Sequence, residues 1–292
     1  MNRSAFLFGS LALCTLPQVA RAQMPIEELL RPAIESIPGK VGLYAHTMAF
    51  GHPIASYNAN VSFPSASTIK MLIMLTAFKA AEHDPAVMRE HVTYRSDDLI
   101  GGSDFLAGAA DGQRFTVAQL IVPMIQLSDN TASNLLITHF GFARINSVTR
   151  KAGLHNTHLR RHFMDFAAIG QHMDNRTTPA DMAHLLFQLE RGVREEISTV
   201  ASPSSCRRMI DIMLGQTDRD TIPRGLPAGV RVANKTGELS RSRSDVAIIE
   251  PYGDSPYVLS VYTNGLDAPD QAYDGIAQIS RIVYHHVAGT DL

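Results

Sequence analysis

The sequence predicts an α/β fold of the α+β kind: one lobe with an antiparallel sheet flanked by terminal helices, and a second, all-helical lobe. The main observation is that strand-like runs lie only near the two ends of the chain. Between them, residues 65–215 show mostly helical periodicity. The expected strands are 41–47, 54–57, 230–235, 246–250 and 257–262. A sheet made from both chain ends, with the middle as an inserted helical lobe, accounts for this order.

The terminal elements follow from local signals. Residues 26–37 have a helical pattern that stops before Pro38-Gly39, a pair that ends helices. The turn around Gly51-His52-Pro53 joins the first two strands as a hairpin. Residues 269–287 are expected to form a closing helix.

The middle of the chain predicts a succession of helices. The best-defined are 69–82, 117–127, 132–140 and 179–190. We therefore assign residues 23–64 and 216–292 to the α/β lobe and 65–215 to the helical lobe of one unit, 23–292. The cleft between two such lobes is the expected place for a site.

Residues 1–22 have the pattern of a signal peptide. Arg3 supplies a positive start, 5–16 is a short apolar stretch, and Ala20-Arg21-Ala22 fits a cleavage site before Gln23. We therefore expect a secreted or periplasmic protein without a membrane anchor, because no later apolar stretch is long enough to span a bilayer. A monomer is the expectation for its oligomeric state.

The cysteines and the net charge argue against a disulfide-stabilised protein and against a nucleic-acid-binding protein. Cleavage would remove Cys14 and leave Cys206 as the single thiol, so no intramolecular disulfide could form. The formal net charge is −2 and there is no long basic run, which argues against nucleic acid as a partner.

The first chemical signal is Ser67-Thr68-Ile69-Lys70. Ser65 would be the N-cap of a helix, which puts Ser67 in its first turn with Lys70 on the same face. Backbone N–H groups in a first turn lack intrahelical partners, so the N–H of Ser67 could help to bind an oxyanion. Lys70 could accept the Ser67 proton if burial and nearby charge lower its pKa.

Two further signals lie downstream. Ser128-Asp129-Asn130 follows an apolar helical run and is typical of a turn that offers a hydroxyl and an amide. Lys235-Thr236-Gly237 ends a strand-like run, where Lys235 and Thr236 could hold a carboxylate and Gly237 would permit close backbone approach.

Each signal is weak alone, but their order and context are specific. On the three motifs, together with the block 128–136, Thr177-Thr178-Pro179 and 226–229, the chain resembles the class A serine β-lactamases and related penicillin-recognising enzymes over nearly its whole mature length. The resemblance implies a secreted hydrolase that opens β-lactam rings through an acyl-enzyme and needs no cofactor.

The resemblance also implies catalytic roles. Ser67 attacks the β-lactam carbonyl, Lys70 acts as base or proton relay, and Ser128 passes a proton to the departing nitrogen. Asp129 is mainly structural, and the backbone N–H groups of Ser67 and Glu238 form the oxyanion hole.

Substrate-binding roles are implied in the same way. Asn130 holds the side-chain amide of the substrate, Lys235 keeps the site positive and orients Ser128, and Thr236 binds the substrate carboxylate. Arg241 and Arg243 lie near enough in sequence to assist with the carboxylate, and neither can be assigned.

The segment 159–176 departs from the family pattern. Class A enzymes carry a Glu in this ω-loop that activates the deacylating water, and here the loop contains no Glu. Counting forward from Ser128 places that position near 164, and counting back from Thr177 places it near 162. The ionisable side chains nearby are His162 and Asp165, and we take Asp165 as the candidate deacylation base.

The missing Glu leaves alternatives open. A penicillin-binding D-Ala-D-Ala peptidase with slow deacylation is one, and a non-catalytic β-lactam binder is another. A metal enzyme is not indicated: the pairs His155/His158 and His158/His162 have spacings that could chelate a metal, but no third ligand follows either pair at a recognisable spacing.

Overall fold

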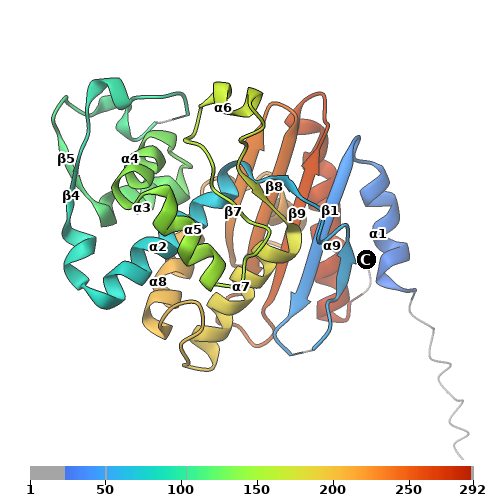
Figure 1. The fold of residues 1–292 in the computed structure, drawn as a ribbon. Coiled ribbons are helices and arrows are strands. Elements are labelled where there is room, and N and C mark those ends of the chain that lie inside the picture. The colour runs from blue at the N-terminus through green and yellow to red at the C-terminus, as the bar shows by residue number, and fades with distance from the viewer. Residues whose placement is uncertain (1–23, 50, 103, 291–292) are drawn as a thin grey trace, which may run out of the picture.

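The computed structural model describes residues 24–290 except 50 and 103, so the expected signal peptide 1–22 lies outside the described residues. Figure 1 shows a five-stranded sheet on one side of the molecule and a largely helical region on the other. The predicted fold class is confirmed.

The sheet joins the two ends of the chain. Its order is β2-β1-β9-β8-β7, and every neighbouring pair is antiparallel. The strands are β1 (Lys40–Thr47), β2 (Ala55–Tyr57), β7 (Val232–Leu239), β8 (Ser242–Ile249) and β9 (Tyr257–Asn264). β1 pairs with β9 along its whole length, from Lys40 opposite Asn264 to Thr47 opposite Tyr257. β7 is left as the edge strand that borders the helical region (Figure 1).

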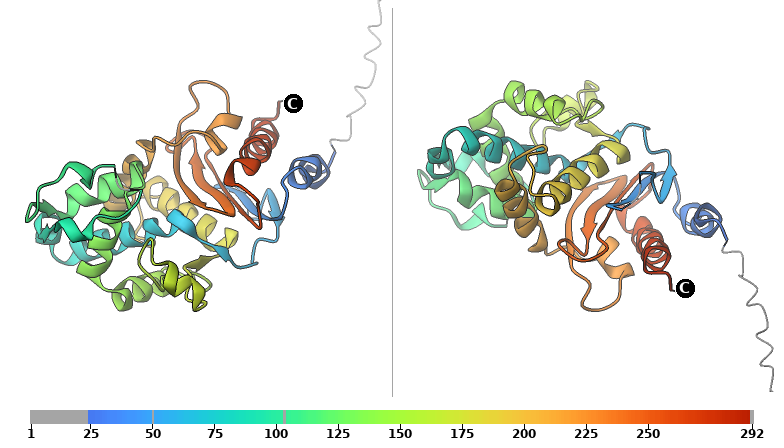
Figure 2. Two further views of the ribbon diagram at one scale, coloured as in Figure 1. Left: turned by 90° about the horizontal axis from the view of Figure 1, so that it is seen from above. Right: turned by 90° about the horizontal axis from the view of Figure 1, so that it is seen from below.

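Helices cover both faces of the sheet. The terminal helices α1 (Ile26–Glu35) and α9 (Tyr273–Ala288) lie together on one face and enclose a core with the inward residues of β1, β8 and β9. α7 (Pro179–Arg194) packs on the other face against β1, β8 and β9, as the two views of Figure 2 show. α7 thus ties the sheet to the helical region.

The helical region is built around α2 (Lys70–His83), whose side chains are buried almost all round. An apolar stretch without a polar face predicts such a central helix. Its neighbours are α3 (Val117–Gln126), α4 (Asn130–Phe140), α5 (Phe142–Lys151) and α8 (Pro203–Leu214). No helix in the described part of the chain is both long and apolar enough to cross a membrane.

The structure adds elements that hydropathy did not reveal. Two short strands, β4 (His91–Thr93) and β5 (Arg114–Thr116), pair within the lobe expected to be all-helical. A second small pair, β3 (Phe63–Pro64) with β6 (Arg176–Thr177), and the short helix α6 (Phe166–Gly170) border the ω-loop. The β7–β8 hairpin is also longer than predicted, so the Lys235-Thr236-Gly237 motif lies within a strand and not at its end.

Candidate active site

Ser67 lies in a strained turn at the start of the buried helix. The turn η1 (Ala66–Ile69) is a 3-10 helix that leads directly into α2, and Ser67 is half-buried in it. Ala66 has φ of 45°, a backbone region that costs a non-glycine residue roughly 1–3 kcal/mol. The Thr68 hydroxyl contacts the Tyr262 hydroxyl on β9 at 2.7 Å and fixes the turn to the sheet.

Ser65 does not cap the turn with its side chain, contrary to the expectation. Its backbone oxygen accepts instead from the Thr68 N–H at 3.2 Å and from the Thr68 hydroxyl at 2.7 Å. Its backbone N–H donates to Asn175 O at 2.9 Å, which joins the turn that carries Ser67 to the ω-loop.

Lys70 follows one turn after Ser67 and is completely buried. Its Nζ donates to the backbone oxygen of Ser128 at 2.6 Å, to Ser128 Oγ at 3.1 Å and to Asn130 Oδ1 at 2.8 Å. All three partners are neutral oxygens, and no carboxylate of the described residues forms an ion pair with Lys70. The amine is therefore held in place without being stabilised as a cation by a direct counter-charge.

This environment favours a neutral Lys70. Burial lowers the pKa of Lys70 well below its ordinary value, and the nearby cation Lys235 lowers it further. The buried carboxylate of Asp129 acts in the opposite direction and does not cancel these effects. A neutral amine has a lone pair and can accept a proton from a serine hydroxyl.

Ser128 lies between the two buried lysines. Lys235 Nζ donates to Ser128 Oγ at 3.1 Å, the same distance as that from Lys70, and to Thr236 O at 2.8 Å. Ser128 also has a positive φ of 57°, which indicates strain at this turn. Burial lowers the pKa of Lys235 to about 7, although Asp218 and Asp245 favour its charged form.

Asn130 and Asp129 fix the turn that carries Ser128. Asn130 Nδ2 donates to Gly101 O at 2.8 Å, so the amide connects Lys70 with the loop at 100–102. The buried carboxylate of Asp129 caps α4 by accepting from Ala132 N at 2.8 Å. The structural role expected for Asp129 agrees with these contacts.

Gly237 lets the edge strand β7 approach the turn that carries Ser67. A side-chain carbon at this position would lie 2.6 Å from Ser244 Oγ, 3.0 Å from the Ala66 Cβ and 3.1 Å from Ser65 O. Any larger residue would therefore push β7 away from η1. The close contact places the strand that carries Glu238 beside Ser67, and an edge strand leaves alternate backbone N–H groups free to bind an oxyanion.

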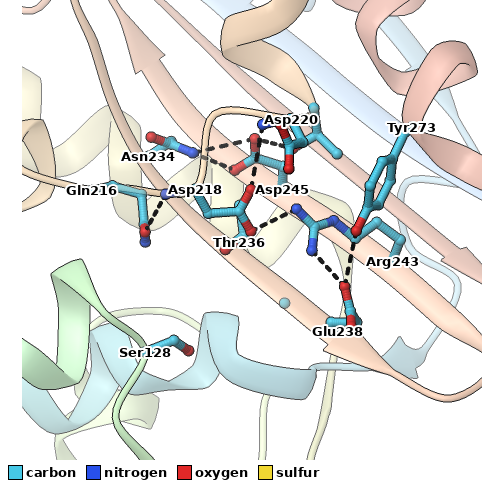
Figure 3. A network of polar contacts seen from close by, with 12 residues as sticks. Ser128, Gln216, Asp218, Asp220, Asn234, Thr236, Glu238, Arg243, Asp245 and Tyr273 are labelled. Carbon is cyan, nitrogen blue, oxygen red and sulfur yellow. Dashed lines mark hydrogen bonds and ion pairs between the residues drawn. The ribbon is translucent and has the colours of Figure 1, made fainter. Parts of the chain in front are cut away.

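One face of the β7–β8 hairpin, which we call the outer face, carries the side chains of Thr236, Glu238 and Arg243. A charged network lies on this face (Figure 3). The Arg243 guanidinium pairs with Asp218 at 2.6 Å and with Glu238 at 2.7 Å, and it lies 4.7 Å from the centre of the Tyr273 ring. Arg243 is thus buried and doubly paired. Arg241, the other candidate for the substrate carboxylate, is exposed and reaches Gly265 O at 3.5 Å.

The buried strand β8 contributes a third acid, Asp245, to this region. Asp245 accepts from the Thr221 hydroxyl at 2.7 Å and from the Asn234 amide at 3.1 Å. Burial raises the pKa of Asp245 to about 6, against the effect of these hydrogen bonds. Its contacts fold the segment before β7 onto the hairpin.

The ω-loop presents an aromatic ring to the lysine. The Phe163 ring centre lies 4.4 Å from Lys70 Nζ, and the backbone of Phe163 is held by Asn134, which donates to its oxygen at 3.1 Å and accepts from its N–H at 2.8 Å. Phe163 lies between the two positions, 162 and 164, that sequence spacing indicated. Sequence reasoning missed it because a phenylalanine carries no acid–base signal.

The structure places Asp165 differently from our expectation. Its side chain is exposed, and its carboxylate caps α6 by accepting from Ala168 N at 3.0 Å. His162 is also turned to other partners, since its Nε2 contacts the Thr138 hydroxyl at 3.3 Å and its ring packs edge-on against Phe142. Burial lowers the pKa of His162, opposed by Asp165. Neither side chain contacts Lys70 or Ser128 in the described structure.

The ω-loop is closed at its neck. His158 and Arg176 form a backbone bridge, and Arg161 pairs with Asp174 at 2.8 Å. The Asn175 side chain accepts from the backbone N–H groups of Arg160 and Arg161. These contacts fix the loop, and with it the ring of Phe163 over Lys70.

Comparisons with known proteins agree with the site. A model of the beta-lactamase enzyme family, Beta-lactamase2, matches residues 25–287. The chain is similar to PBP-A, with 27% identity over 91% of this chain and 98% of that chain and a TM-score of 0.80. A PBP-A variant in an acyl-enzyme complex with penicillin G matches with a TM-score of 0.79.

Two β-lactamases are similar to the same extent. The enzyme from Sphaerobacter thermophilus is 27% identical over 92% of this chain and 98% of that chain, with a TM-score of 0.80. An ancestral class A β-lactamase is 30% identical over 89% and 99%, with a TM-score of 0.79. Both penicillin-binding proteins and β-lactamases are thus among the related structures.

Proposed function

Because the chain belongs to the beta-lactamase enzyme family, we propose that it is a serine enzyme that β-lactams acylate at Ser67 and that releases the acyl group slowly. Peptides ending in D-Ala-D-Ala are the proposed natural class of substrate, because they present a scissile amide beside a carboxylate, as β-lactams do. We therefore favour a penicillin-binding peptidase over an efficient β-lactamase.

The acylation step uses the groups around Ser128. Neutral Lys70 takes the proton of Ser67 as its oxygen attacks the carbonyl, and the oxyanion binds to the backbone N–H groups of Ser67 and Glu238. When the carbon–nitrogen bond breaks, Ser128 gives its proton to the departing nitrogen. Lys70 then returns its proton to Ser128, along the 3.1 Å contact between Nζ and Oγ.

One observation carries the proposal of slow release: the ring of Phe163 lies against Lys70 where a general base would be needed. Hydrolysis of the acyl-enzyme requires a group that removes a proton from water, and such a group contributes roughly 10²–10⁴-fold. An aromatic ring cannot do this. Asp165, our sequence-based candidate, is engaged as a helix cap.

The similarity to PBP-A and to its acyl-enzyme with penicillin G supports this proposal. Fast β-lactam hydrolysis is the second candidate, favoured by the equally high similarity to β-lactamases. A non-catalytic β-lactam binder is the third outcome that an experiment has to separate.

The test is to mix the purified protein with a chromogenic cephalosporin and follow colour and intact mass together. We expect a burst of about one equivalent, a stable adduct that maps to Ser67, and turnover slow enough to be followed by hand. Sustained rapid colour without an accumulating adduct would contradict slow release. Binding without colour or adduct would contradict the acyl-enzyme itself.

A peptide assay tests the natural substrate class. We expect release of D-alanine from a diacylated tripeptide that ends in D-Ala-D-Ala, and loss of this release after preincubation with penicillin G. Release that persists after Ser67 is fully acylated would contradict a shared site.

We also propose that the protein acts outside the cytoplasm, since residues 1–22 fit a signal peptide. Expression with the native leader in a Gram-negative host should yield a periplasmic protein whose amino terminus is Gln23. A cytoplasmic protein that retains residues 1–22 would contradict the assignment.

A further inference from the structure

The carboxylate end of the proposed substrate site already contains carboxylates of the protein. Arg243 is the cation of the hairpin nearest to Thr236 on the outer face, yet its side chain is only 4% exposed and both ends of its guanidinium are occupied. Asp218 holds one end at 2.6 Å and Glu238 the other at 2.7 Å. Its Nε has no partner among the described residues but is buried, so an incoming anion meets no exposed edge of the guanidinium for a bidentate pair.

The two acids hold Arg243 in different ways. The Asp218 side chain is 28% exposed, and although burial opposes it, the attraction of Arg243 and a hydrogen bond from the Thr236 side chain lower the pKa of Asp218, which favours its charged form beside Arg243. The side chain of Glu238 is 48% exposed, and the Tyr273 hydroxyl donates to it at 3.3 Å. Glu238 is thus the exchangeable partner of Arg243, and Asp218 is the fixed one.

Strand geometry places the Glu238 carboxylate beside the carboxylate subsite. Thr236 and Glu238 are two residues apart on β7, so their side chains lie on the same face. Arg243 is directly opposite Glu238 in the β7–β8 pairing, on that face as well. An anion held by the Thr236 hydroxyl would lie roughly 7 Å from the Glu238 side chain, the spacing of alternate strand residues.

We propose that Glu238 is a specificity-determining residue that occupies Arg243 in place of a substrate carboxylate and disfavours substrates with an anionic group at this position. The proposal rests on the proposed acylation of Ser67. A carboxylate substrate has to displace Glu238 from Arg243 or bind beside it against its charge, whereas an esterified or amidated substrate meets no such repulsion. Compared with a site whose arginine is free, this site should therefore discriminate less strongly between a substrate carboxylate and its blocked form.

The surrounding charges do not remove the repulsion. Lys235 is the other cation on this strand, and it lies on the opposite face, where its Nζ is engaged by Ser128 and Thr236 O. Asp245 adds a further acid on the face of Thr236 and Glu238, opposite Thr236 in the pairing. Arg243 thus keeps its two acidic contacts, Asp218 and Glu238, and Asp245 is a third acid close to the position that would receive the anion.

The test is the variant Glu238→Gln, measured with penicillin G and with the methyl ester of penicillin G. Acylation rate constants come from intact mass at a series of times. The substitution keeps the backbone N–H of the oxyanion hole, and Asp218 still anchors Arg243, so the hairpin should stay folded. We expect the ratio of the rate constant for the acid to that for the ester to rise about three- to tenfold, as expected for the loss of a partly exposed like charge at this distance.

Two controls make the result specific. Glu195→Gln removes an exposed acid that pairs with Arg191 at the end of α7 and should leave the ratio unchanged. Added salt should raise the ratio in the wild-type protein and have a weaker effect in Glu238→Gln, because it screens the repulsion.

The outcomes separate this inference from the proposed function. Adducts in both proteins with an unchanged or lower acid-to-ester ratio would overturn the role of Glu238 while leaving acylation of Ser67 in place. No adduct with either compound in either protein would overturn the proposed function and this inference together.

Discussion

Two walls enclose the amine of Lys70, and they are built from different chemistry. On the Ser128 side, three neutral oxygens contact the amine at 2.6–3.1 Å, and a second lysine shares the same hydroxyl. On the ω-loop side, the amine meets the ring of Phe163 at 4.4 Å. The first wall has the groups needed to move a proton between Ser67 and a leaving nitrogen, and the second has none that could activate water.

Under the proposed function, acylation and release would be carried by separate segments of the chain. The turn at 128–130 and the strand β7 would serve the first step, and the loop at 158–176 would serve the second. A chain can therefore keep the groups around Ser128 while its ω-loop places a residue other than an acid against Lys70. Single substitutions in each segment test this division.

Removal of the nucleophile should abolish the first step. In Ser67→Ala, the adduct with penicillin G should be lost, with a decrease in the acylation rate of at least roughly 10³-fold. Intact-mass spectrometry measures the adduct, and an unchanged thermal unfolding curve shows that the fold is retained. An adduct that persists on another residue would contradict the assignment of Ser67 as the acylated residue.

Introduction of an acid on the ω-loop should restore the second step. Phe163→Glu places a carboxylate where the ring meets Lys70, and we expect the rate of acyl-enzyme breakdown to rise roughly 10²-fold or more through general-base catalysis. Decay of the penicillin G adduct measures this rate. Phe163→Leu is the matched control and should deacylate as slowly as the wild type; equal rates in both variants would mean that the loop does not limit release.

The charge of Lys235 should set the alkaline limit of acylation. Since burial lowers the pKa of Lys235 to about 7, the folded protein loses this positive charge as the pH rises through that value. Acylation by penicillin G should therefore fall several-fold between about pH 7 and pH 8.5, because attraction of the substrate carboxylate weakens.

Two measurements check this prediction. Lys235→Arg should move the alkaline limb upward, since a guanidinium stays charged. The same lowered pKa means that the unfolded chain binds more protons than the folded one between about 7 and 10.5, so this group makes the free energy of unfolding rise with pH in that window. An acylation rate that stays flat from about pH 6 to pH 9 would contradict the assignment.

Loss of the helix cap should have the smallest effect, and only on stability. Asp165→Asn weakens the cap of the exposed helix α6, so we expect a decrease of at most ~1 kcal/mol in the free energy of unfolding, measured by urea titration. The rate of acyl-enzyme breakdown should not change. A marked slowing of release would restore Asp165 as the base and remove the role given to Phe163.

The sequence predicts the order of helices and strands well because most elements bury an apolar face. β8 shows where that method fails. Its first half, Ser242 to Asp245, is polar and fully buried, and its charges are satisfied by Asp218, Glu238, Thr221 and Asn234. Hydropathy cannot recognise a strand whose polar side chains find partners only in the folded protein, so it predicts a hairpin that is too short.

The candidate site also contains residues that the sequence predicts and one, Phe163, that it does not. Ser67, Lys70, Ser128 and Lys235 belong to residue types that carry chemistry, so their spacing along the chain is informative by itself. Phe163 is apolar, and its place over Lys70 depends on two hydrogen bonds between its backbone and the Asn134 side chain. Backbone contacts of this kind leave no signature in residue type, which is why residue type alone points to Asp165 instead.

The pairing of β1 with β9 has a consequence for how the protein assembles. The central strand pair of the sheet joins residues 40–47 to residues 257–264, so more than 200 residues separate its two partners. Contacts of such sequence separation form late, because closing the intervening loop costs entropy before any contact is gained. A growing chain can collapse its helical region first, but Lys235 and the rest of β7 reach Ser67 only across a similarly long sequence separation. Reactivity toward β-lactams should therefore appear at the last stage of folding. Covalent labelling of Ser67 during refolding would then measure how fast the native state is completed.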